Sequence, residues 1–291
     1  MTAMLAMDIG GTKIQACSVD ADMAVRALGR TPTALLRRGT TAFAADLASL
    51  IRSIRPPACA RIGVSLNGVL DRGTAVYSSL MGGRVDFPLG VFLSETLACP
   101  VVVDDDIHAM TLAEARLGVG RSVASFAMVN IGTGIGVGFF DRGVLRGRFA
   151  AGLISEQPIW VEEFGEYRSL DRTVCGRGIR DVYRQLSGED ADAITVFRRG
   201  KEKDASARAT IAIFSRYLGA TLQLVSRFYH PALIVLNGSI KFAADQYLAT
   251  AMTAYRTGLD QAFQADIVVS RLQHAAELGT LLSESASEAR P

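Results

Sequence analysis

The 291-residue sequence has few cysteines and almost no net charge. No cysteine lies within four residues of another, which excludes a Cys-x-x-Cys pair and a locally built zinc knuckle. The four are Cys17, Cys59, Cys99 and Cys175. The 31 basic and 29 acidic residues give a formal charge of +2, and we find no basic stripe of the kind that follows a nucleic-acid backbone. Nucleic acid is therefore not expected as a partner. Cys17 alternates with apolar residues, so we expect it in the hydrophobic core.

Long apolar runs are also missing from the chain. No stretch approaches the roughly 18–20 apolar residues that cross a bilayer, so no membrane span or membrane partner is expected. The start, "MTAMLAMDIGG", has neither the basic flank nor the small-residue cleavage site of a signal peptide, which makes the cytoplasm the expected location. A hydrophobic content of 49% indicates a substantial core, in one large domain or two.

Strand-like and helix-like segments are mixed along the chain, which indicates the α/β class. Residues 4–8 and 14–19 flank a Gly-Gly turn and predict a β-hairpin. Residues 41–54 have the apolar spacing of a helix. A buried strand is expected at 101–103, with a helix at 107–118 after it.

The second half of the chain has the same mixed character. Residues 191–228 are mostly helical in pattern, with a charged break at "RRGKEKDASA". Further helices are expected at about 243–255 and 274–288, with a short strand, "DIVVS", between them. The tail at 286–291 is expected to be frayed.

Two glycine-rich stretches, "DIGGTKIQACSVD" and "NIGTGIGVGFFD", can be aligned with each other. A glycine turn that leaves a strand lets backbone N–H groups converge on an anion. The Walker A spacing is missing, and the dinucleotide fingerprint needs a helix where "GIGVGFF" predicts a strand. The repeat therefore predicts two phosphate-binding hairpins in two related lobes.

These motifs resemble the sugar kinases of the ROK (repressor, open reading frame, kinase) family, within the actin-like ATPase superfamily, over nearly the whole chain. "DIGGTK" and "NIGTGIGVG" are similar to the two phosphate loops of that family, and "VLNGSI" to its adenosine-side turn. The resemblance implies a two-lobed actin-like ATPase (ribonuclease H-like) fold with a duplicated β-hairpin core. Residues 1–112 would form a smaller lobe, 113–273 a larger one, and the helix at 274–288 would pack on the first. The lobes would close on sugar and ATP.

The resemblance also implies which residues bind ATP and Mg2+, the expected cofactors. Asp8 would hold Mg2+ through water. The ATP- and phosphate-binding residues would be Gly10, Gly11, Thr12, Lys13, Thr133, Gly134 and Gly238.

Three consecutive acids follow the strand at 101–103. The resemblance places Asp105 at an asparagine of the family and Asp106 at its general base, which accepts the proton of the sugar hydroxyl. Asp106 is also expected to cap the helix after it, a role compatible with catalysis. Asp104 is expected to be solvated, and His108 to lie on the helix surface.

The sugar-binding motif of the family is altered in this chain. Leu153 stands at its glutamate, Glu156 at its histidine, and Asp171 at a further sugar-binding acid. Asn67 either borders the sugar or is an ordinary turn residue. The cysteine-rich zinc segment is reduced to one cysteine, so no structural zinc is expected. Trp160 is expected in the core.

The acids at 105 and 156 add anionic acceptors, which would suit a substrate with an ammonium group. The favoured function is phosphorylation of the 6-hydroxyl of an aminohexose such as kanosamine (3-amino-3-deoxyglucose). The alternatives are a kinase of glucose or another neutral hexose, and a sugar-sensing pseudokinase. A DNA-binding regulator is not expected, because the first strand begins by residue 4. The family suggests a homodimer, and ATP and polyphosphate remain alternative donors.

Overall fold

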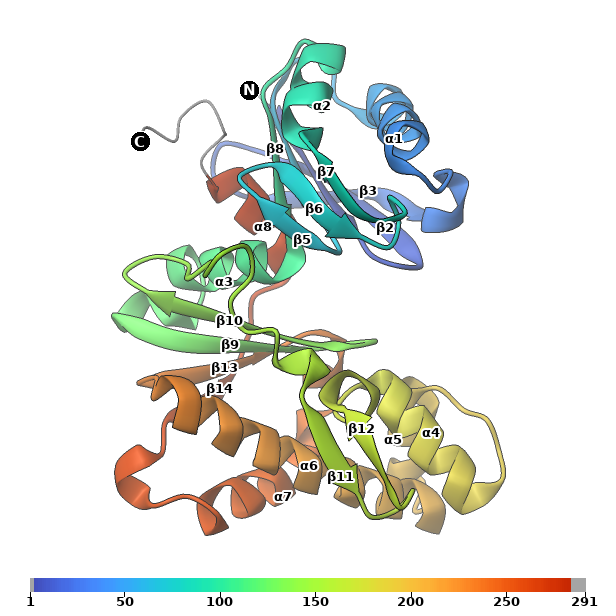
Figure 1. Cartoon of the computed structure of the whole chain (residues 1–291), viewed down its shortest axis with the longest axis vertical. Helices are drawn as coiled ribbons and strands as arrows, with labels where there is room; N and C mark the ends of the chain where they lie inside the picture. The colour runs from blue at the N-terminus through green and yellow to red at the C-terminus, as the bar shows by residue number, and fades with distance from the viewer. Residues whose placement is uncertain (1–2, 284–291) are drawn as a thin grey trace. The chain divides into compact units, whose positions relative to one another are not determined.

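The computed structural model describes residues 3–283, which form two compact units (Figure 1). Unit 1 holds the described residues up to Leu117, the segment Val144–Ala150 and the described residues from Leu272 onward. Unit 2 holds Gly118–Gly143 and Ala151–Arg271. The sequence-based division assigned residues 144–150 to the second lobe, and the structure corrects this, because Arg146 pairs with Asp104 of unit 1.

Unit 1 is built on a five-stranded sheet with the strand order β3-β2-β1-β4-β8. β1 and β2 form the antiparallel hairpin, β3 extends it, and β1, β4 and β8 run parallel to one another. The strands are β1 Ala3–Ile9, β2 Lys13–Val19, β3 Val25–Pro32, β4 Cys59–Leu66 and β8 Val101–Asp105. Because β1, β4 and β8 are parallel, the polar side chains at their carboxyl ends share one edge of the sheet.

Helices cover both faces of this sheet because side chains alternate between the faces along each strand. Leu5 and Met7 of β1 belong to a core shared with α1 and α2, whereas Ala6 and Cys17 belong to a core shared with α3 and α8. Cys17 is thus a core residue, as predicted. The helices are α1 Thr40–Ile54, α2 Leu89–Leu97, α3 Asp106–Arg116 and α8 Ala275–Leu282.

Helix α8 packs closely on its neighbours because two glycines allow it. A Cβ added at Gly63 of β4 would lie 2.3 Å from Thr280 Oγ1, and one added at Gly279 would lie 1.8 Å from the Ala109 carbonyl oxygen of α3. A small antiparallel sheet completes unit 1, with β5 Val69–Asp71, β6 Thr74–Ser78 and β7 Gly83–Phe87.

Unit 2 repeats this core. Its sheet has the order β10-β9-β13-β14, with β9 antiparallel to β10 and parallel to β13, and β13 parallel to β14. Both sheets therefore join a glycine hairpin to parallel strands, as the sequence repeat predicted. The strands are β9 Ser125–Ile131, β10 Ile135–Asp141, β13 Leu233–Asn237 and β14 Asp266–Val269, with a separate hairpin of β11 Pro158–Val161 and β12 Glu166–Ser169.

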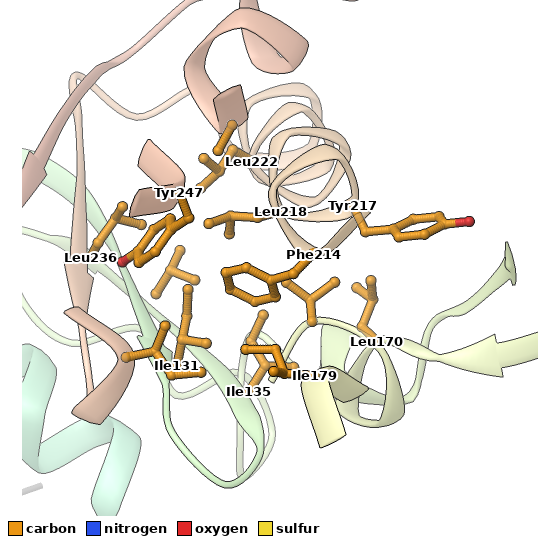
Figure 2. Close-up of a cluster of buried hydrophobic side chains, with 14 of the residues drawn as sticks. Ile131, Ile135, Leu170, Ile179, Phe214, Tyr217, Leu218, Leu222, Leu236 and Tyr247 are labelled. Atoms are coloured by element: carbon orange, nitrogen blue, oxygen red, sulfur yellow. The ribbon is translucent and has the colours of Figure 1, made fainter. Parts of the chain in front are cut away.

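The hydrophobic core of unit 2 lies between this sheet and its helices. Figure 2 shows Phe214 and Leu218 of α6 pointing into a cluster with Ile131 and Ile135 of the glycine hairpin. Tyr217 turns its hydroxyl out of the cluster, where it donates to Glu163. The helices are α4 Gly176–Ser187, α5 Ala193–Lys201, α6 Ala205–Tyr229 and α7 Ala244–Thr257. This packing anchors the second glycine turn on a rigid support.

The expected elements agree closely with the observed ones, apart from the end of the chain. Two helices with a break at 202–204 occupy the segment expected to be mostly helical. The last helix ends at Leu282 rather than near residue 288, and the expected frayed tail lies outside the described residues. Within residues 3–283, no helix combines the length and the apolar composition needed to cross a bilayer.

Candidate active site

The glycine turn of unit 1 is a short loop between β1 and β2. The Gly10 N–H donates to the Lys13 carbonyl over 3.0 Å and closes the turn. Thr33 supports it from outside the hairpin, with its hydroxyl donating to the Gly10 carbonyl (2.8 Å) and its N–H to the Thr12 carbonyl (3.1 Å). Gly11, Thr12 and Lys13 are exposed. The loop therefore presents backbone and a lysine side chain on a fixed base, an arrangement suited to binding phosphate.

Asp8 lies near the carboxyl end of β1, beside Ser65 of β4. The Ser65 hydroxyl donates to Asp8 Oδ1 over 2.8 Å. Burial, followed by the charge of Glu277, raises the pKa of Asp8 to about 6. A half-buried carboxylate whose negative charge is destabilised in this way is a hard oxygen ligand that a nearby cation would stabilise.

Asp106 is the first residue of α3 and follows β8 directly. Its carboxylate accepts from the Ile107 N–H (3.0 Å), and the nearby Asn67 side chain slightly lowers its pKa. Burial, and then the charges of Asp105 and Asp8, raise the pKa of Asp106 to about 7. A carboxylate with this proton affinity, oriented by an amide, is suited to act as a general base near neutral pH.

The cap of α3 is the neighbouring acid, not Asp106, which corrects the prediction for that position. Asp105 Oδ1 accepts from the His108 N–H over 2.7 Å and is the N-cap acceptor. Asp105 has the non-helical backbone needed for capping, whereas Asp106 already belongs to the helix. Asp106 is thereby left outside the capping interaction.

A buried charge network lies behind Asp106. Two guanidinium nitrogens of Arg146 bind the carboxylate of Asp104, and the His108 imidazole forms an ion pair with Asp105. The expectations of a solvated Asp104 and a surface His108 are both wrong: their exposed fractions are 4% and 1%. Arg146 comes from a segment distant in sequence, so the charge partner that allows this burial was not visible in the local pattern.

The pKa values in this network follow from its pairing. Burial alone would lower the pKa of His108, but hydrogen bonds to Asp104 and Asp105 outweigh it and raise the pKa to about 9. Burial would raise the pKa of Asp104, yet Arg146 and His108 lower it to about 2. Burial raises the pKa of Asp105. Two acids and two cations thus compensate each other, and Asp105 already has a cationic partner.

The second glycine turn, in unit 2, is held by Asp171. The Gly132 N–H donates to the Gly134 carbonyl (2.9 Å), and Asp171 Oδ1 accepts from the Ile135 N–H (3.1 Å). A Cβ at Gly134 would lie 2.3 Å from that carboxylate oxygen, so a larger residue there would displace the Asp171 side chain from the turn. Asp171 also pairs with Arg177. Its observed role is to shape the turn, which the sequence pattern did not indicate.

A cavity of about 540 Å³ lies beside this turn, within unit 2. That volume falls within the range of small-molecule sites, roughly 300–1,000 Å³. Basic side chains and an apolar wall from α4, α5 and the segment after β13 surround it. The lining residues include Thr133, Arg177, Ile194, Phe197, Arg198, Lys201, Ser239, Ile240 and Phe242. The sequence analysis did not identify these basic residues, because they belong to no glycine motif and to no run of acidic residues.

Gly238 shapes the approach of β13 to β9 next to the cavity. Its φ is +89°, and a Cβ there would lie 2.2 Å from the Ile131 carbonyl oxygen. Both the backbone conformation and the close contact therefore require glycine. Asn237, just before it, accepts from the Gly238 N–H and from the Lys241 ammonium.

The remaining predicted site residues lie in two places. Asn67 lies beside Asp106 in unit 1, where its side chain lowers the pKa of that carboxyl. Glu156 is exposed in unit 2, in the 3-10 helix η3 (Ile154–Glu156), which packs against η4 (Leu170–Arg172), the element that carries Asp171. Trp160, expected in the core, is 50% exposed, because it lies on the β11–β12 hairpin facing Tyr167.

Comparisons with known proteins extend over nearly the whole chain. The sequence model of the ROK family matches residues 4–282. An N-acetylmannosamine kinase of Escherichia coli O127:H6 is 28% identical over 284 residues, 94% of this chain and 95% of that protein. An N-acetylmannosamine kinase of Escherichia fergusonii is 28% identical over 285 residues, with the same coverage.

Solved structures show the same architecture. A ROK family glucokinase from Streptomyces griseus, in complex with glucose and AMPPNP, has a TM-score of 0.82 at 18% identity, covering 97% of this chain and 99% of its own. A ROK hexokinase from Thermus thermophilus has a TM-score of 0.74 at 27% identity, with coverages of 96% and 97%. The predicted actin-like ATPase fold is confirmed.

Proposed function

We propose that this chain, which belongs to the ROK family and is an ATP-dependent sugar kinase, phosphorylates the 6-hydroxyl of a hexose that carries a nitrogen substituent. The observation that carries the proposal is Asp106 at the start of α3, a carboxylate that accepts from the Ile107 N–H and has its pKa raised to about 7. Asp106 accepts the proton of the sugar hydroxyl as that oxygen attacks the γ-phosphate. A base of this kind contributes about 10²–10⁴-fold to the rate.

The two glycine turns hold the phosphates. In unit 1, the Gly10 N–H closes the turn, Gly11 and Thr12 offer their backbone N–H groups, and Lys13 offers its ammonium. In unit 2, Thr133 and Gly134 contact the γ-phosphate side. The rigid support of each turn, by Thr33 in one unit and by Asp171 in the other, favours orientation of the phosphates without reorganisation.

The cavity of unit 2 receives the nucleoside part of ATP. Its apolar wall suits stacking and packing of the base, and its basic rim suits the phosphates. Gly238 lies beside it, where the resemblance places the adenosine turn.

Asp8 fits a Mg2+ ion bound through water. The carboxylate is a hard oxygen donor, Ser65 fixes one of its oxygens, and burial destabilises its negative charge. Mg2+ bound there would supply charge neutralisation for the transferring phosphoryl group. The residues of this chain supply its position and that of the sugar.

The nitrogen substituent of the acceptor is best supplied as an amide. The curated relatives described above are N-acetylmannosamine kinases, and Asp105 already has His108 as its cationic partner. This favours N-acetylmannosamine over a sugar with a free ammonium group. The exposed carboxylate of Glu156 favours a second candidate, kanosamine, since an acceptor-only group suits an ammonium.

The test is ADP release by the purified chain with Mg-ATP and each of glucose, mannosamine, glucosamine, N-acetylmannosamine and kanosamine. We expect the highest kcat/KM with N-acetylmannosamine, and position 6 of the product identified by NMR. Glucose exceeding every nitrogen-bearing sugar would refute the acceptor proposal, and ADP release with none of them would indicate a pseudokinase.

Glu156→Gln separates the two nitrogen-bearing candidates. If Glu156 contacts an ammonium group, KM for kanosamine rises while KM for N-acetylmannosamine does not. Glu162→Gln, at a neighbouring exposed glutamate, is the matched control. If both variants changed the two KM values equally, Glu156 would not be a sugar-binding residue.

A further inference from the structure

Three side chains of unit 1 that have no assigned role in binding sugar or ATP converge between β2 and α8, and the charge of one of them, Glu277, acts on Asp8. Cys17 lies on β2, and His274 and Glu277 lie at the start of α8. Cys17 Sγ is 3.6 Å from His274 Nδ1 and 3.9 Å from Glu277 Oε1. The His274 Nδ1 to Glu277 Oε1 distance is 3.2 Å. One thiol, one imidazole and one carboxylate therefore bring their donor atoms around one point.

The triangle of donor atoms has the dimensions of one face of a zinc tetrahedron. Zinc bonds of about 2.3 Å to sulfur, 2.05 Å to nitrogen and 2.1 Å to oxygen, at tetrahedral angles, separate the ligands by about 3.6 Å (S–N), 3.6 Å (S–O) and 3.4 Å (N–O). Each observed distance differs from its counterpart by no more than about 0.3 Å. Little movement would be needed to bind the ion.

A nucleophilic relay does not account for this geometry. In a thiol–imidazole–carboxylate relay, the thiol and the carboxylate contact opposite nitrogens of the ring. Here Cys17 and Glu277 both face Nδ1 of His274. Donor atoms that face a common point suit a cation between them.

The other group of potential ligands in the described part of the chain already contains a cation. Asp104, Asp105 and His108 are also close together, but the Arg146 guanidinium binds Asp104 and lies 3.0 Å from His108 Nδ1. That group is a compensated ion network. In the cluster of Cys17, His274 and Glu277, the short contacts join the three potential ligands to one another.

Burial and access also suit a bound ion. Cys17 and Glu277 are 0% and 5% exposed, whereas the His274 side chain is 30% exposed. An ion can enter on the side of His274, where water can take the fourth position. His274 has φ +56° and ψ +35°, an uncommon left-handed conformation for histidine, at the N-cap of α8.

We propose that Cys17, His274 and Glu277 form a zinc site that links β2 of the first glycine hairpin to α8. The thiol and imidazole donors select Zn2+ over Mg2+, which prefers oxygen. On binding, the Cys17 thiol loses its proton to solvent and the thiolate, imidazole nitrogen and carboxylate oxygen bond to the ion. Cys17 and His274 are 257 positions apart, so the expectation of no zinc, which rested on closely spaced cysteines, did not consider this site.

The test uses the full chain, stripped with a chelator and titrated with Zn2+ and separately with Co2+. We expect one equivalent to bind, with a thiolate-to-Co2+ charge-transfer band in the near ultraviolet. Cys17→Ser should remove the band, and His274→Asn and Glu277→Gln should each weaken Zn2+ binding at least about 10–100-fold. Asparagine tolerates the left-handed conformation of His274, so that variant keeps the backbone.

Matched controls separate the site from other thiols and histidines. Cys99→Ser removes another buried thiol, and His230→Asn replaces a second histidine in the left-handed conformation, φ +48°; both should bind metal like the wild type. Zn2+ should raise the melting temperature of the wild type but not that of folded His274→Asn. Absence of the Co2+ band in the wild type, or wild-type affinity in His274→Asn, would overturn the proposal.

Discussion

Gly279→Ala tests how α8 positions the helix that carries Asp106. The added Cβ would lie 1.8 Å from the Ala109 carbonyl oxygen and 2.3 Å from its carbon. Ordinary contacts begin near 3.4 Å, so the two helices must separate by well over 1 Å. Both atoms on the α3 side belong to the backbone, and no side-chain rotation can relieve the contact.

The expected free-energy cost follows from two opposing terms. Replacing a helical glycine by alanine stabilises a helix by about 1 kcal/mol. Overpacking costs about 1–3 kcal/mol and more where the backbone must move. Because backbone atoms must move, the overpacking cost is at or above about 3 kcal/mol, and we expect a net loss of about 2 kcal/mol or more in the stability of unit 1. Because the displaced helix carries Asp106, kcat should also fall, since a misplacement of about 1 Å can cost about 10²-fold.

Hydrogen exchange read by mass spectrometry is the suitable assay, because it reports α3 and α8 separately from unit 2. We expect faster exchange in peptides of both helices and unchanged exchange in α6. Gly143→Ala is the control, because a Cβ there meets no described atom within 4 Å. Wild-type exchange and wild-type kcat in Gly279→Ala would refute the packing argument.

Three further predictions concern the charges and the second glycine site. Because the pKa of Asp106 is raised to about 7 and the base must be ionised, kcat/KM should fall about tenfold per pH unit below that value; Asp106→Asn should lower kcat about 10²–10⁴-fold and leave nucleotide affinity unchanged. Arg146→Met should destabilise unit 1 by about 2 kcal/mol, less than for a fully buried pair because Arg146 is 34% exposed. The pKa of Asp104 is lowered to about 2, so this stability is present above pH 3.8 and is lost as pH falls toward 2. Gly238→Ala should weaken binding of a fluorescent ATP analogue, because the added Cβ would overlap the Ile131 carbonyl oxygen at the end of β9.

Each of these has its own control and its own contrary result. If kcat/KM of Asp106→Asn still fell at low pH as it does in the wild type, the titrating group would not be Asp106. Arg148→Met, at an exposed neighbouring arginine, should leave the midpoint of urea unfolding unchanged. An equal shift of the midpoint in both arginine variants would show that loss of the ion pair is not the cause. Gly143→Ala again controls Gly238→Ala, and wild-type nucleotide affinity in both would contradict the role of Gly238.

Local sequence patterns determined most of the framework. The alternation of apolar residues around two glycine turns predicted both hairpins, because strand periodicity and glycine conformation depend on near neighbours. The position of Asp106 after a buried strand likewise predicted a carboxylate at the edge of the sheet. The acid run and the glycine turns are contiguous in the chain and therefore recognisable from residue order alone, whereas the basic residues that line the unit 2 cavity follow no such pattern.

The state of the charged and ligand-forming residues was decided only by tertiary structure. The three acids at 104–106 look alike in sequence, yet Arg146 pairs with Asp104, His108 pairs with Asp105, and Asp106 has a raised pKa and is the proposed base. The same holds for Cys17, whose proposed role depends on His274 at the other end of the chain. Burial and pairing set the proton affinity of a group, and both come from residues that only the folded chain brings together.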